Sequence, residues 1–210
     1  MTAPPHVPGV HPDGSVIGVD AGTATLREAD HLVRRLAGGL GLPGGSTACT
    51  HLIRAAERRG TTVSFALPDA DAARAAWQRL PGLAPPAPDF GAVLGDLAYG
   101  AAGPAGWAAA GAAEHARRSG GRAVLYPGAD RLTGTVVLAE LLATTAVERV
   151  VVLGAPGAEG PDPGTPVLTR DHVRPEWREG VLTLVLVPAA GGTLAPFEVP
   201  NPTPCCADHD

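Results

Sequence analysis

Apolar and polar residues along the first half of this chain follow two spacings, one typical of strands and one typical of helices. Short runs rich in β-branched and aromatic residues predict strands at 15–20 and 62–67. In 25–36 the apolar residues recur every three or four positions, which predicts an amphipathic helix. The glycines at 38–39 are expected to end that helix.

Two more helices are expected, one before and one after the second strand. The segment 48–59 has an apolar face and follows Ser46 or Thr47, either of which suits an N-cap. An acidic N-cap, Asp69 or Asp71, predicts the other helix.

The most informative stretch is 89–138. It predicts a glycine-punctuated loop at 91–106, an alanine-rich helix that stops at 117–121, and strands at 123–126 and 135–138. Because alanine and glycine let two backbones approach closely, we expect this helix to pack tightly in the centre of a layered fold.

Strands dominate the rest of the chain. The run 139–146 is ambiguous between strand and helix, whereas 149–153 predicts a buried strand. The runs 181–187 and 193–199 are separated by AAGG and predict a hairpin. Strands that alternate with helices up to the central stretch imply an α/β fold.

At 210 residues the chain suits one domain, or one domain with an appendage, and it is long enough to bury a real core. Its 22 Pro gather near both ends and in two internal segments, which marks those places as loops or linkers. We expect a flexible leader at 1–14, an α/β domain at 15–145, a β-rich extension completing its sheet at 146–200, and a Cys/His tail at 201–210.

Composition and charge argue against several functions. All 16 basic residues are Arg, which excludes chemistry that needs a Lys, such as a Schiff base or a Walker-type phosphate loop. The net charge is −5 with no basic cluster, so we expect no nucleic-acid partner. No apolar run approaches the roughly 20 residues that span a bilayer, and the first residues lack a signal-peptide pattern. We therefore expect a cytoplasmic protein without a membrane partner.

Five segments, taken in order, resemble the C-terminal half of a β-ketoacyl synthase, a member of the thiolase-like fold. They are HLIRAAERRG (51–60) in a helix position, TTVSFAL (61–67) in the next strand, PDADAARAAWQRL (68–80) as an acid-capped helix, VLGDLAYGAAGPAGWAAA (93–110) as glycine loop and buried helix, and GRAVLYPGADRLTGTVVL (121–138) as a closing strand pair. The resemblance covers about 15–138 and implies a thiolase-like layered α/β half-domain with a C-terminal hairpin extension.

The chain departs from this family at the catalytic positions. Where the family has a His-Gly-Thr-Gly-Thr motif, this chain has ALPDA at 66–70, and where the family has Lys and Gly-His it has Leu94, Gly95 and Asp96. The family's two histidines supply acid–base and electrostatic help in decarboxylative condensation. The resemblance therefore implies a non-catalytic relative, a pseudoenzyme.

Such a relative is expected to act as a partner or modulator in fatty-acid or polyketide biosynthesis. Synthases of this fold pair through a sheet edge, so the resemblance implies a homo- or hetero-dimer and, as partner, a ketosynthase-like protein or an acyl carrier protein. It implies no cofactor. The substrate-contacting residues that the resemblance carries over are Asp96, Tyr99, Gly100 and Gly103.

The alternative function is that of a metal-binding protein or small enzyme. Cysteine and histidine side chains near position 50 and in the last six residues could form a tetrahedral Zn²⁺ site, and they are Cys49, His51, Cys205, Cys206 and His209. Against this, residues two apart on a helix point to different faces, and adjacent cysteines seldom bind one metal. A small buried Cys49 and an exposed tail are the simpler interpretation.

Other segments suggest weaker sites. The GLPGGST turn at 41–47 would offer backbone amides to an anion if a helix followed it, though an ordinary capped turn explains it as well. VIGVDAGTA (16–24) resembles the first phosphate-binding strand of sugar kinases and actin-like ATPases but lacks the hairpin expected next. The charged run 170–174 suits an acid–base site or a solvated loop. A ligand-binding scaffold with a pocket beside 91–106 is a third function.

Overall fold

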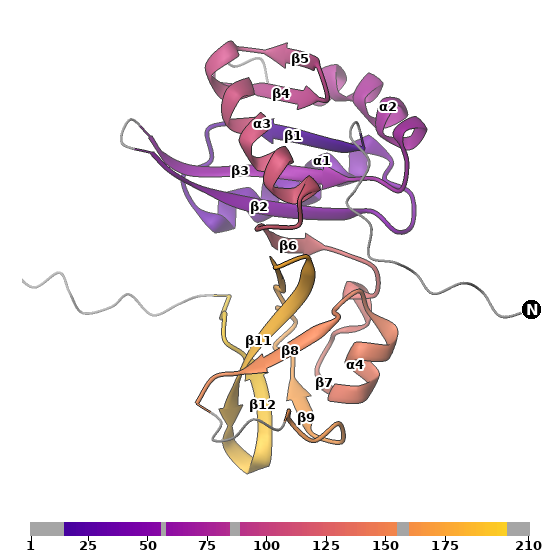
Figure 1. The fold of residues 1–210 in the computed structure, drawn as a ribbon, viewed down its shortest axis with the longest axis vertical. Coiled ribbons are helices and arrows are strands. Elements are labelled where there is room, and N and C mark those ends of the chain that lie inside the picture. Colours follow the sequence, from indigo (N-terminus) through magenta and orange to yellow (C-terminus); the bar gives the residue numbers. More distant parts are fainter. Residues whose placement is uncertain (1–14, 56–57, 85–88, 155–159, 201–210) are drawn as a thin grey trace, which may run out of the picture. The chain divides into compact units, whose positions relative to one another are not determined.

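The computed structural model describes residues 15–55, 58–84, 89–154 and 160–200 (Figure 1). It confirms that the chain mixes helices with strands, and these strands pair mostly in the antiparallel sense. The thiolase-like arrangement stays a prediction. The described residues form two compact units. The first contains the chain up to Pro127 together with Glu176–Leu182, and the second contains Gly128–Pro175 and the chain from Thr183 onward. The first division thus falls at 127, before the boundary expected at 145. In addition, Glu176–Leu182 belongs to the first unit although it comes later in the sequence.

The first unit is built on one antiparallel sheet. Its elements are β1 (Val16–Asp20), α1 (Leu26–Leu40), β2 (Thr47–Arg54), β3 (Arg59–Ala66), α2 (Ala70–Arg79), β4 (Gly91–Leu94), β5 (Leu97–Gly100), α3 (Ala102–Ala116), β6 (Arg122–Leu125), β10 (Glu176–Arg178) and the start of β11 (Val181–Ala189). The strand order is β5-β4-β1-β3-β2-β6-β10. Within it, β1-α1-β2-β3-α2-β4 with the order β4-β1-β3-β2 is the split β-α-β arrangement of ferredoxin-like domains.

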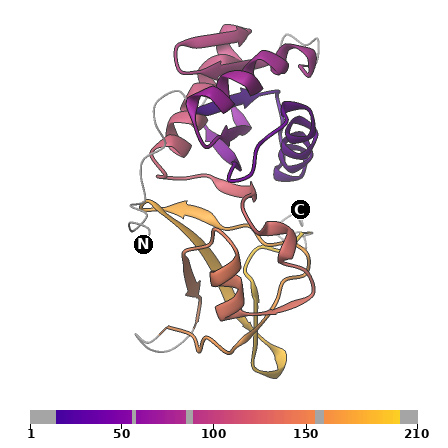
Figure 2. The ribbon, with the colours of Figure 1, turned by 90° about the vertical axis from the view of Figure 1, so that its right-hand side faces the viewer.

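Helices cover both faces of this sheet (Figure 2). On one face, α1 and α2 enclose the main core with inward side chains of the strands, including Ile17, Val63 and Phe65. On the other face, α3 packs on Val16, Ala66 and Val93. Successive strand residues point to opposite faces, so β3 places Val63 and Phe65 in the main core and Ser64 under α3.

Several predicted elements of this unit are confirmed. The strands at 15–20 and 62–67 correspond to β1 and β3. Thr25 caps α1 through a reciprocal pair of bonds with Glu28, and Asp69 caps α2 by accepting from the Ala72 amide. However, α1 does not end at 38–39: it continues to Gly41, whose φ of 64° is the left-handed conformation that favours glycine.

The helix predicted at 48–59 is wrong. Residues 47–54 form β2, which pairs with β3 over eight positions from Thr47↔Ala66 to Arg54↔Arg59 and with β6 on its other edge. This long-range pairing outweighs the local apolar spacing that favoured a helix. One consequence bears on the site, because Cys49 and His51 now share one face of a strand.

The loop predicted at 91–106 is also wrong. Residues 91–100 form the β4–β5 hairpin, which turns at Gly95 with a φ of 55°, and α3 begins at Ala102. The alanine-rich helix packs closely on the sheet as expected. It does not lie in the centre of the fold, because Gly103, Gly106 and Ala109 on its outer side are exposed.

The second unit is smaller and β-rich. It contains β7 (Thr135–Val137), α4 (Leu138–Thr144), β8 (Arg149–Val152), β9 (Pro166–Leu168), most of β11, and β12 (Thr193–Pro196). β8 pairs in parallel with β11, β12 pairs with β11 and β9, and β9 pairs with β7. The predicted β11–β12 hairpin is confirmed, the ambiguous run at 139–146 is mostly helical, and the strand predicted at 149–153 is only half-buried. No helix among the described residues is long and apolar enough to cross a membrane.

Candidate functional site

The interface between α3 and the sheet is made mostly of very small residues. A Cβ atom added to Gly18 would lie 2.2 Å from the carbonyl oxygen of Ala108, and one added to Gly91 would lie 2.2 Å from the amide nitrogen of Ala105. The helix backbone therefore rests almost directly on β1 and β4. Any polar side chain buried in so tight a layer needs partners within the layer itself.

Five polar side chains lie at one end of this interface. Cys49 and His51 come from β2, Ser64 from β3, and Glu114 and His115 from the last turn of α3. Strand alternation puts Cys49 and His51 on the same face, and Ser64 is the direct cross-strand partner of Cys49. The local secondary structure thus gathers three side chains of the sheet beneath two of the helix.

These side chains form one continuous hydrogen-bonded chain. Oε2 of Glu114 lies 2.5 Å from Nδ1 of His51, and Nε2 of His51 lies 2.7 Å from Oγ of Ser64. The same hydroxyl lies 2.7 Å from Nδ1 of His115, whose Nε2 lies 3.7 Å from the sulfur of Cys49. The chain therefore runs from a partly exposed carboxylate to a fully buried thiol.

The two ends of the chain fix the direction of its hydrogen bonds. Burial raises the pKa of the Cys49 thiol far above its usual range, so the sulfur keeps its proton. The hydrogen bond from His51 lowers the pKa of Glu114, which is therefore an ionised acceptor. With a donor at one end and an acceptor at the other, the arrangement that satisfies every bond has Nδ1–H of His51 donating to Glu114, Ser64 donating to Nε2 of His51, and Nδ1–H of His115 donating to Ser64.

The carboxylate–Nδ1 and Nε2–hydroxyl connections match those of an acid–histidine–serine triad in a hydrolase. In a hydrolase triad the serine is accessible to the substrate, but here the acid is the accessible residue. Ser64 is completely inaccessible, whereas the side chain of Glu114 is 42% exposed. A molecule that approaches this hydrogen-bonded chain from solvent meets the carboxylate of Glu114. Ser64 cannot act as a nucleophile towards that molecule.

Two glycines hold His51 in place. A Cβ atom on Gly111 would lie 3.3 Å from Cδ2 of its ring, and one on Gly121 would lie 2.6 Å from Cε1. Gly121 also has a φ of 108°, which favours glycine. The imidazole therefore lies between two backbone segments that have no side chain in its way.

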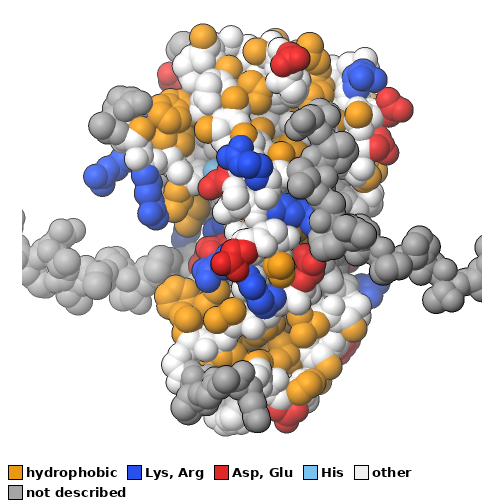
Figure 3. All heavy atoms as spheres, viewed as in Figure 1, with side chains coloured by type: hydrophobic (Ala, Val, Ile, Leu, Met, Phe, Trp, Pro, Cys, Tyr) orange, Lys and Arg blue, Asp and Glu red, His pale blue; other side chains and the backbone are white. Residues whose placement is uncertain are grey.

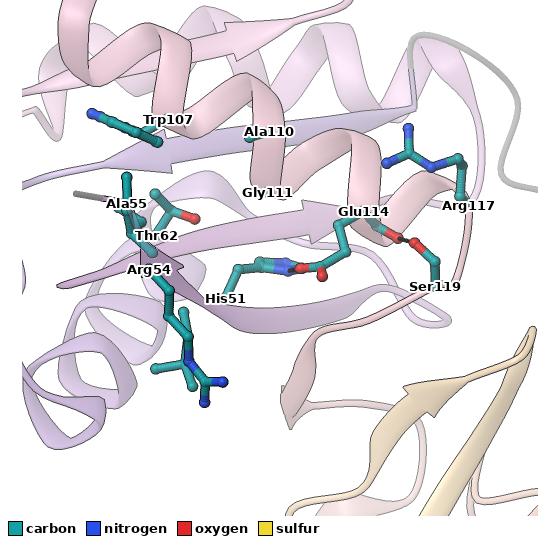
Figure 4. A pocket seen from close by; sticks show the side chains of 12 residues that line it. His51, Arg54, Ala55, Thr62, Trp107, Ala110, Gly111, Glu114, Arg117 and Ser119 are labelled. Atoms are coloured by element: carbon teal, nitrogen blue, oxygen red, sulfur yellow. Dashed lines mark hydrogen bonds and ion pairs between the residues drawn. The ribbon is translucent and has the colours of Figure 1, made fainter. Parts of the chain in front are cut away.

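A pocket of about 360 Å³ opens beside this end of α3 (Figure 4). We call it the α3 groove. Residues of α3 and of the turn that follows it form one wall, and the end of β2, the residue after it and one residue of β3 form the other. The lining residues are Trp107, Ala110, Gly111, Glu114, Arg117 and Ser119, with His51, Leu52, Ile53, Arg54, Ala55 and Thr62. Figure 3 shows acidic and basic side chains close together on this unit, with a small area of histidine surface between them.

The size of the α3 groove follows from helical spacing. Trp107 and Glu114 lie two turns apart on α3, about 10 Å along the axis, and Ala110 and Gly111 lie between them. Because these two residues have almost no side chain, the groove is hollow between an aromatic ring and a carboxylate. Figure 4 shows Trp107 at one end, His51 pointing at Glu114 at the other, and Arg54 directed away from both.

At its buried end, the hydrogen-bonded chain of side chains lies next to β10. The rings of His115 and Trp177 lie 6.3 Å apart, and the Arg118 guanidinium lies 4.7 Å from the centre of the indole. The indole Nε1 is buried without a hydrogen-bond partner among the described residues. Burial raises the pKa of the Cys49 thiol, and the nearby indole of Trp177 lowers that pKa by a smaller amount.

The residues predicted from the sequence fall in different places. Asp96, Tyr99, Gly100 and Gly103 are exposed on the β4–β5 hairpin and the start of α3, and none of them lines the α3 groove. Of the predicted zinc ligands, Cys49 and His51 share a face of β2 but bond to different partners. The other three, Cys205, Cys206 and His209, lie outside the described residues. Within the described ranges, no three His, Cys, Asp or Glu side chains are grouped so as to hold a metal ion.

The weaker sites have structural explanations. The turn at 41–47 leads into a strand, so the helix expected after it is absent there. Asp20, at the end of β1, is buried and bonded to Arg58 and to the Gly22 amide. In the second unit, His172 pairs with Glu198 at 3.0 Å, and Asp171 accepts from the Gly134 amide.

Comparisons with protein-family models, with curated proteins and with solved structures found no match. The resemblance to β-ketoacyl synthases therefore stays a prediction. Two of its element assignments differ from the structure. HLIRAAERRG was assigned to a helix but contributes to β2 and β3, and the strands of 121–138 belong to different units and do not pair with each other.

Sequence reasoning did not find Ser64, Glu114 or His115. Glu114 and His115 are the only residues with ionisable side chains in α3, which is otherwise almost entirely alanine and glycine. That contrast was a usable signal. Their partners could not be identified while 48–59 was interpreted as a helix.

Proposed function

We propose that the first unit binds a small molecule in the α3 groove and holds it through the carboxylate of Glu114. The observation that carries this proposal is the position of that carboxylate. It is fixed by His51 at 2.5 Å, yet it remains 42% exposed in a groove hollowed by Ala110 and Gly111. A hydrogen bond that served only to join α3 to the sheet would have no need of the hollow beside it.

The groove also defines the chemistry of the ligand. Glu114 accepts hydrogen bonds and favours an ammonium, N–H or O–H group. Trp107 offers a flat apolar surface, and a cation over its ring would gain further. The preferred ligand is therefore an elongated molecule with a flat apolar part at one end and a donor or cationic group at the other. Its whole length is about 10 Å, the separation of Trp107 and Glu114 along the helix axis.

Saturation-transfer NMR with two probes of similar shape and opposite charge tests this. Tryptamine has a flat ring and an ammonium group, whereas indole-3-propionate has the ring and a carboxylate. We expect saturation transfer to tryptamine at millimolar concentration, at least threefold weaker transfer to indole-3-propionate, and loss of the tryptamine signal in Glu114→Gln.

A pair of alanines supplies the matched control. Ala110 lines the α3 groove and Ala109 does not, and both are exposed on the same helix. Ala110→Phe should abolish tryptamine binding, and Ala109→Phe should leave it unchanged. Tryptamine that does not bind, or that binds equally to Glu114→Gln and Ala110→Phe, would contradict the proposal.

A second proposal keeps the partner role in fatty-acid or polyketide assembly. It is supported by β5, the terminal strand of the first unit's sheet, in which Leu97 and Tyr99 are exposed. Exposed edge strands are templates for pairing with another chain. Co-purification with a ketosynthase or an acyl carrier protein, lost in Leu97→Lys, would support this role. A monomer that captures neither protein would count against it.

A further inference from the structure

We infer that Glu114 is a general base, so that the α3 groove removes a proton from the molecule it binds. This inference rests on the proposed binding function and goes beyond it. A carboxylate that only anchors a ligand needs a charge and a position. A base also needs an oxygen free to receive the proton and a local structure that tolerates the proton once it has arrived.

The carboxylate has a free oxygen. Oε2 of Glu114 receives the hydrogen bond of His51, whereas Oε1 takes no hydrogen bond from any residue that the structure describes. Oε1 lies at Gly120, where an added Cβ atom would approach it to 2.4 Å. The absence of a side chain at Gly120 therefore leaves this oxygen uncrowded.

The groups around Glu114 keep it ionised. His51 from β2 and Arg117 from the next turn of α3 both lower its pKa, against the opposing effect of partial burial. The hydroxyl of Ser119 donates to the backbone carbonyl of Glu114, at 3.3 Å, and not to its carboxylate. Glu114 is consequently a carboxylate at neutral pH, the form that accepts a proton.

The buried part of the chain acts on the base through orientation. Ser64 donates to Nε2 of His51, which leaves Nδ1–H as the only proton of that ring and directs it at Oε2. His115 and Cys49 continue the same direction into the core. His51, Ser64 and His115 are positioning residues in this scheme, and Glu114 is the member of the hydrogen-bonded chain that receives the proton.

The proton step requires no cofactor. A C–H, N–H or O–H proton passes to Oε1 of Glu114, and the bonding electron pair stays with the ligand, where it expels a leaving group or forms a double bond. Glu114 becomes a neutral acid that still accepts from His51. Because its side chain is 42% exposed, it can return the proton to water.

A chemical probe tests this without knowledge of the natural ligand. 5-Nitrobenzisoxazole is flat, apolar and a carbon acid. When a base removes its C3 proton, the C–H electron pair forms the third bond of a nitrile and the N–O bond breaks, which gives a coloured cyanonitrophenolate. We expect the protein to accelerate this reaction above an equal concentration of acetate, with a fall in kcat/KM of about 10²-fold in Glu114→Gln.

The pH profile separates the base from its positioning residues. In the wild-type protein, activity should fall on the acid side with a midpoint below the ordinary glutamate pKa of about 4.3. In His51→Gln that midpoint should move upward, whereas a substitution that merely perturbed folding would lower the whole profile. Glu114→Asp, which keeps a carboxylate, should retain part of the rate.

The results distinguish the two proposals. Binding of tryptamine together with a rate no higher than that of acetate, or a rate that Glu114→Gln leaves unchanged, would overturn the general-base inference and leave the binding proposal standing. Absence of both tryptamine binding and probe turnover would overturn both.

Discussion

Nδ1 of His51 lies 2.5 Å from Oε2 of Glu114, and the ring's other nitrogen is bonded to a hydroxyl that solvent cannot reach. This relationship orients the whole chain of polar groups so that its charged end faces the α3 groove. It also gives the first unit a pH-dependent contact between helix and sheet.

The first prediction concerns acid stability. Because the folded protein lowers the pKa of Glu114, this group adds stability above its ordinary pKa of about 4.3, and the stability is lost as the pH falls through the lowered value. We expect Glu114→Gln to lower the free energy of unfolding by roughly 1 kcal/mol at pH 7, a value reduced by solvent screening. In urea titrations the difference should narrow as the pH falls below the ordinary glutamate pKa and close at a pH below the lowered value.

Glu140→Gln, at an exposed position of α4, is the control and should show no difference at neutral or at acid pH. An equal loss at neutral and at acid pH for Glu114→Gln would mean that the carboxylate charge does not matter for this contact.

The second prediction concerns the tight layer under α3. Gly18→Ala would place a methyl group 2.2 Å from the Ala108 carbonyl oxygen, which belongs to the helix backbone and cannot rotate away. We expect a loss of about 2–3 kcal/mol in the free energy of unfolding. Gly103, in α3 itself, has no atom within 4 Å of an added Cβ, so Gly103→Ala should be neutral or stabilising by up to about 1 kcal/mol. Similar effects of the two substitutions would show that α3 is not held this closely.

The third prediction tests the hydrogen-bonded chain. Ser64→Ala removes the group that joins Nε2 of His51 to Nδ1 of His115 and leaves both buried nitrogens without it. Thermal and urea unfolding should show a loss of about 2–3 kcal/mol. Ser46→Ala removes a hydroxyl whose bond to the Pro43 carbonyl is solvent-accessible, and it should cost under about 0.5 kcal/mol. A Ser64→Ala protein as stable as wild type would refute the chain.

The fourth prediction concerns the opposite face of the sheet. Arg122 donates to Asp30 at 2.6 Å, and both side chains are at least nine-tenths buried. Arg122→Met removes this partner from a buried carboxylate and should cost about 3–5 kcal/mol.

A double substitution completes that test. Asp30→Leu combined with Arg122→Met removes both charges and should be more stable than Arg122→Met alone. The exposed pair of Arg74 and Asp71 is the control, because Arg74→Met should change stability by less than about 1 kcal/mol. A double variant less stable than the single one would contradict this account.

Elements with strong local signals could be predicted from the sequence. The apolar spacing of 25–36 indicates α1, and the acidic cap offered by Asp69 or Asp71 indicates α2. β2 could not be predicted in this way, because Leu52 and Ile53 fit a helical face as well as a strand. Pairing with β3 over eight positions decides its conformation, and that pairing is a property of the tertiary structure.

The same limitation hid the site. Cys49 and His51 were identified as chemically interesting, but their partners come from β3 and α3, far along the chain. Spacing within a single segment cannot show that Ser64 lies opposite Cys49 or that the last turn of α3 lies above both. The β4–β5 hairpin was missed for a related reason, since glycines that permit a tight turn also suggest a loop.

The assignment of Glu176–Leu182 to the first unit has a consequence for synthesis. A ribosome makes β10, with Trp177, only after the whole segment 128–175 has been made. Until then β6 lacks one neighbouring strand, and His115 lacks the aromatic ring beside it. The first unit cannot therefore finish folding before most of the second has been translated, and a chain released early would carry an open sheet edge prone to pair with other chains.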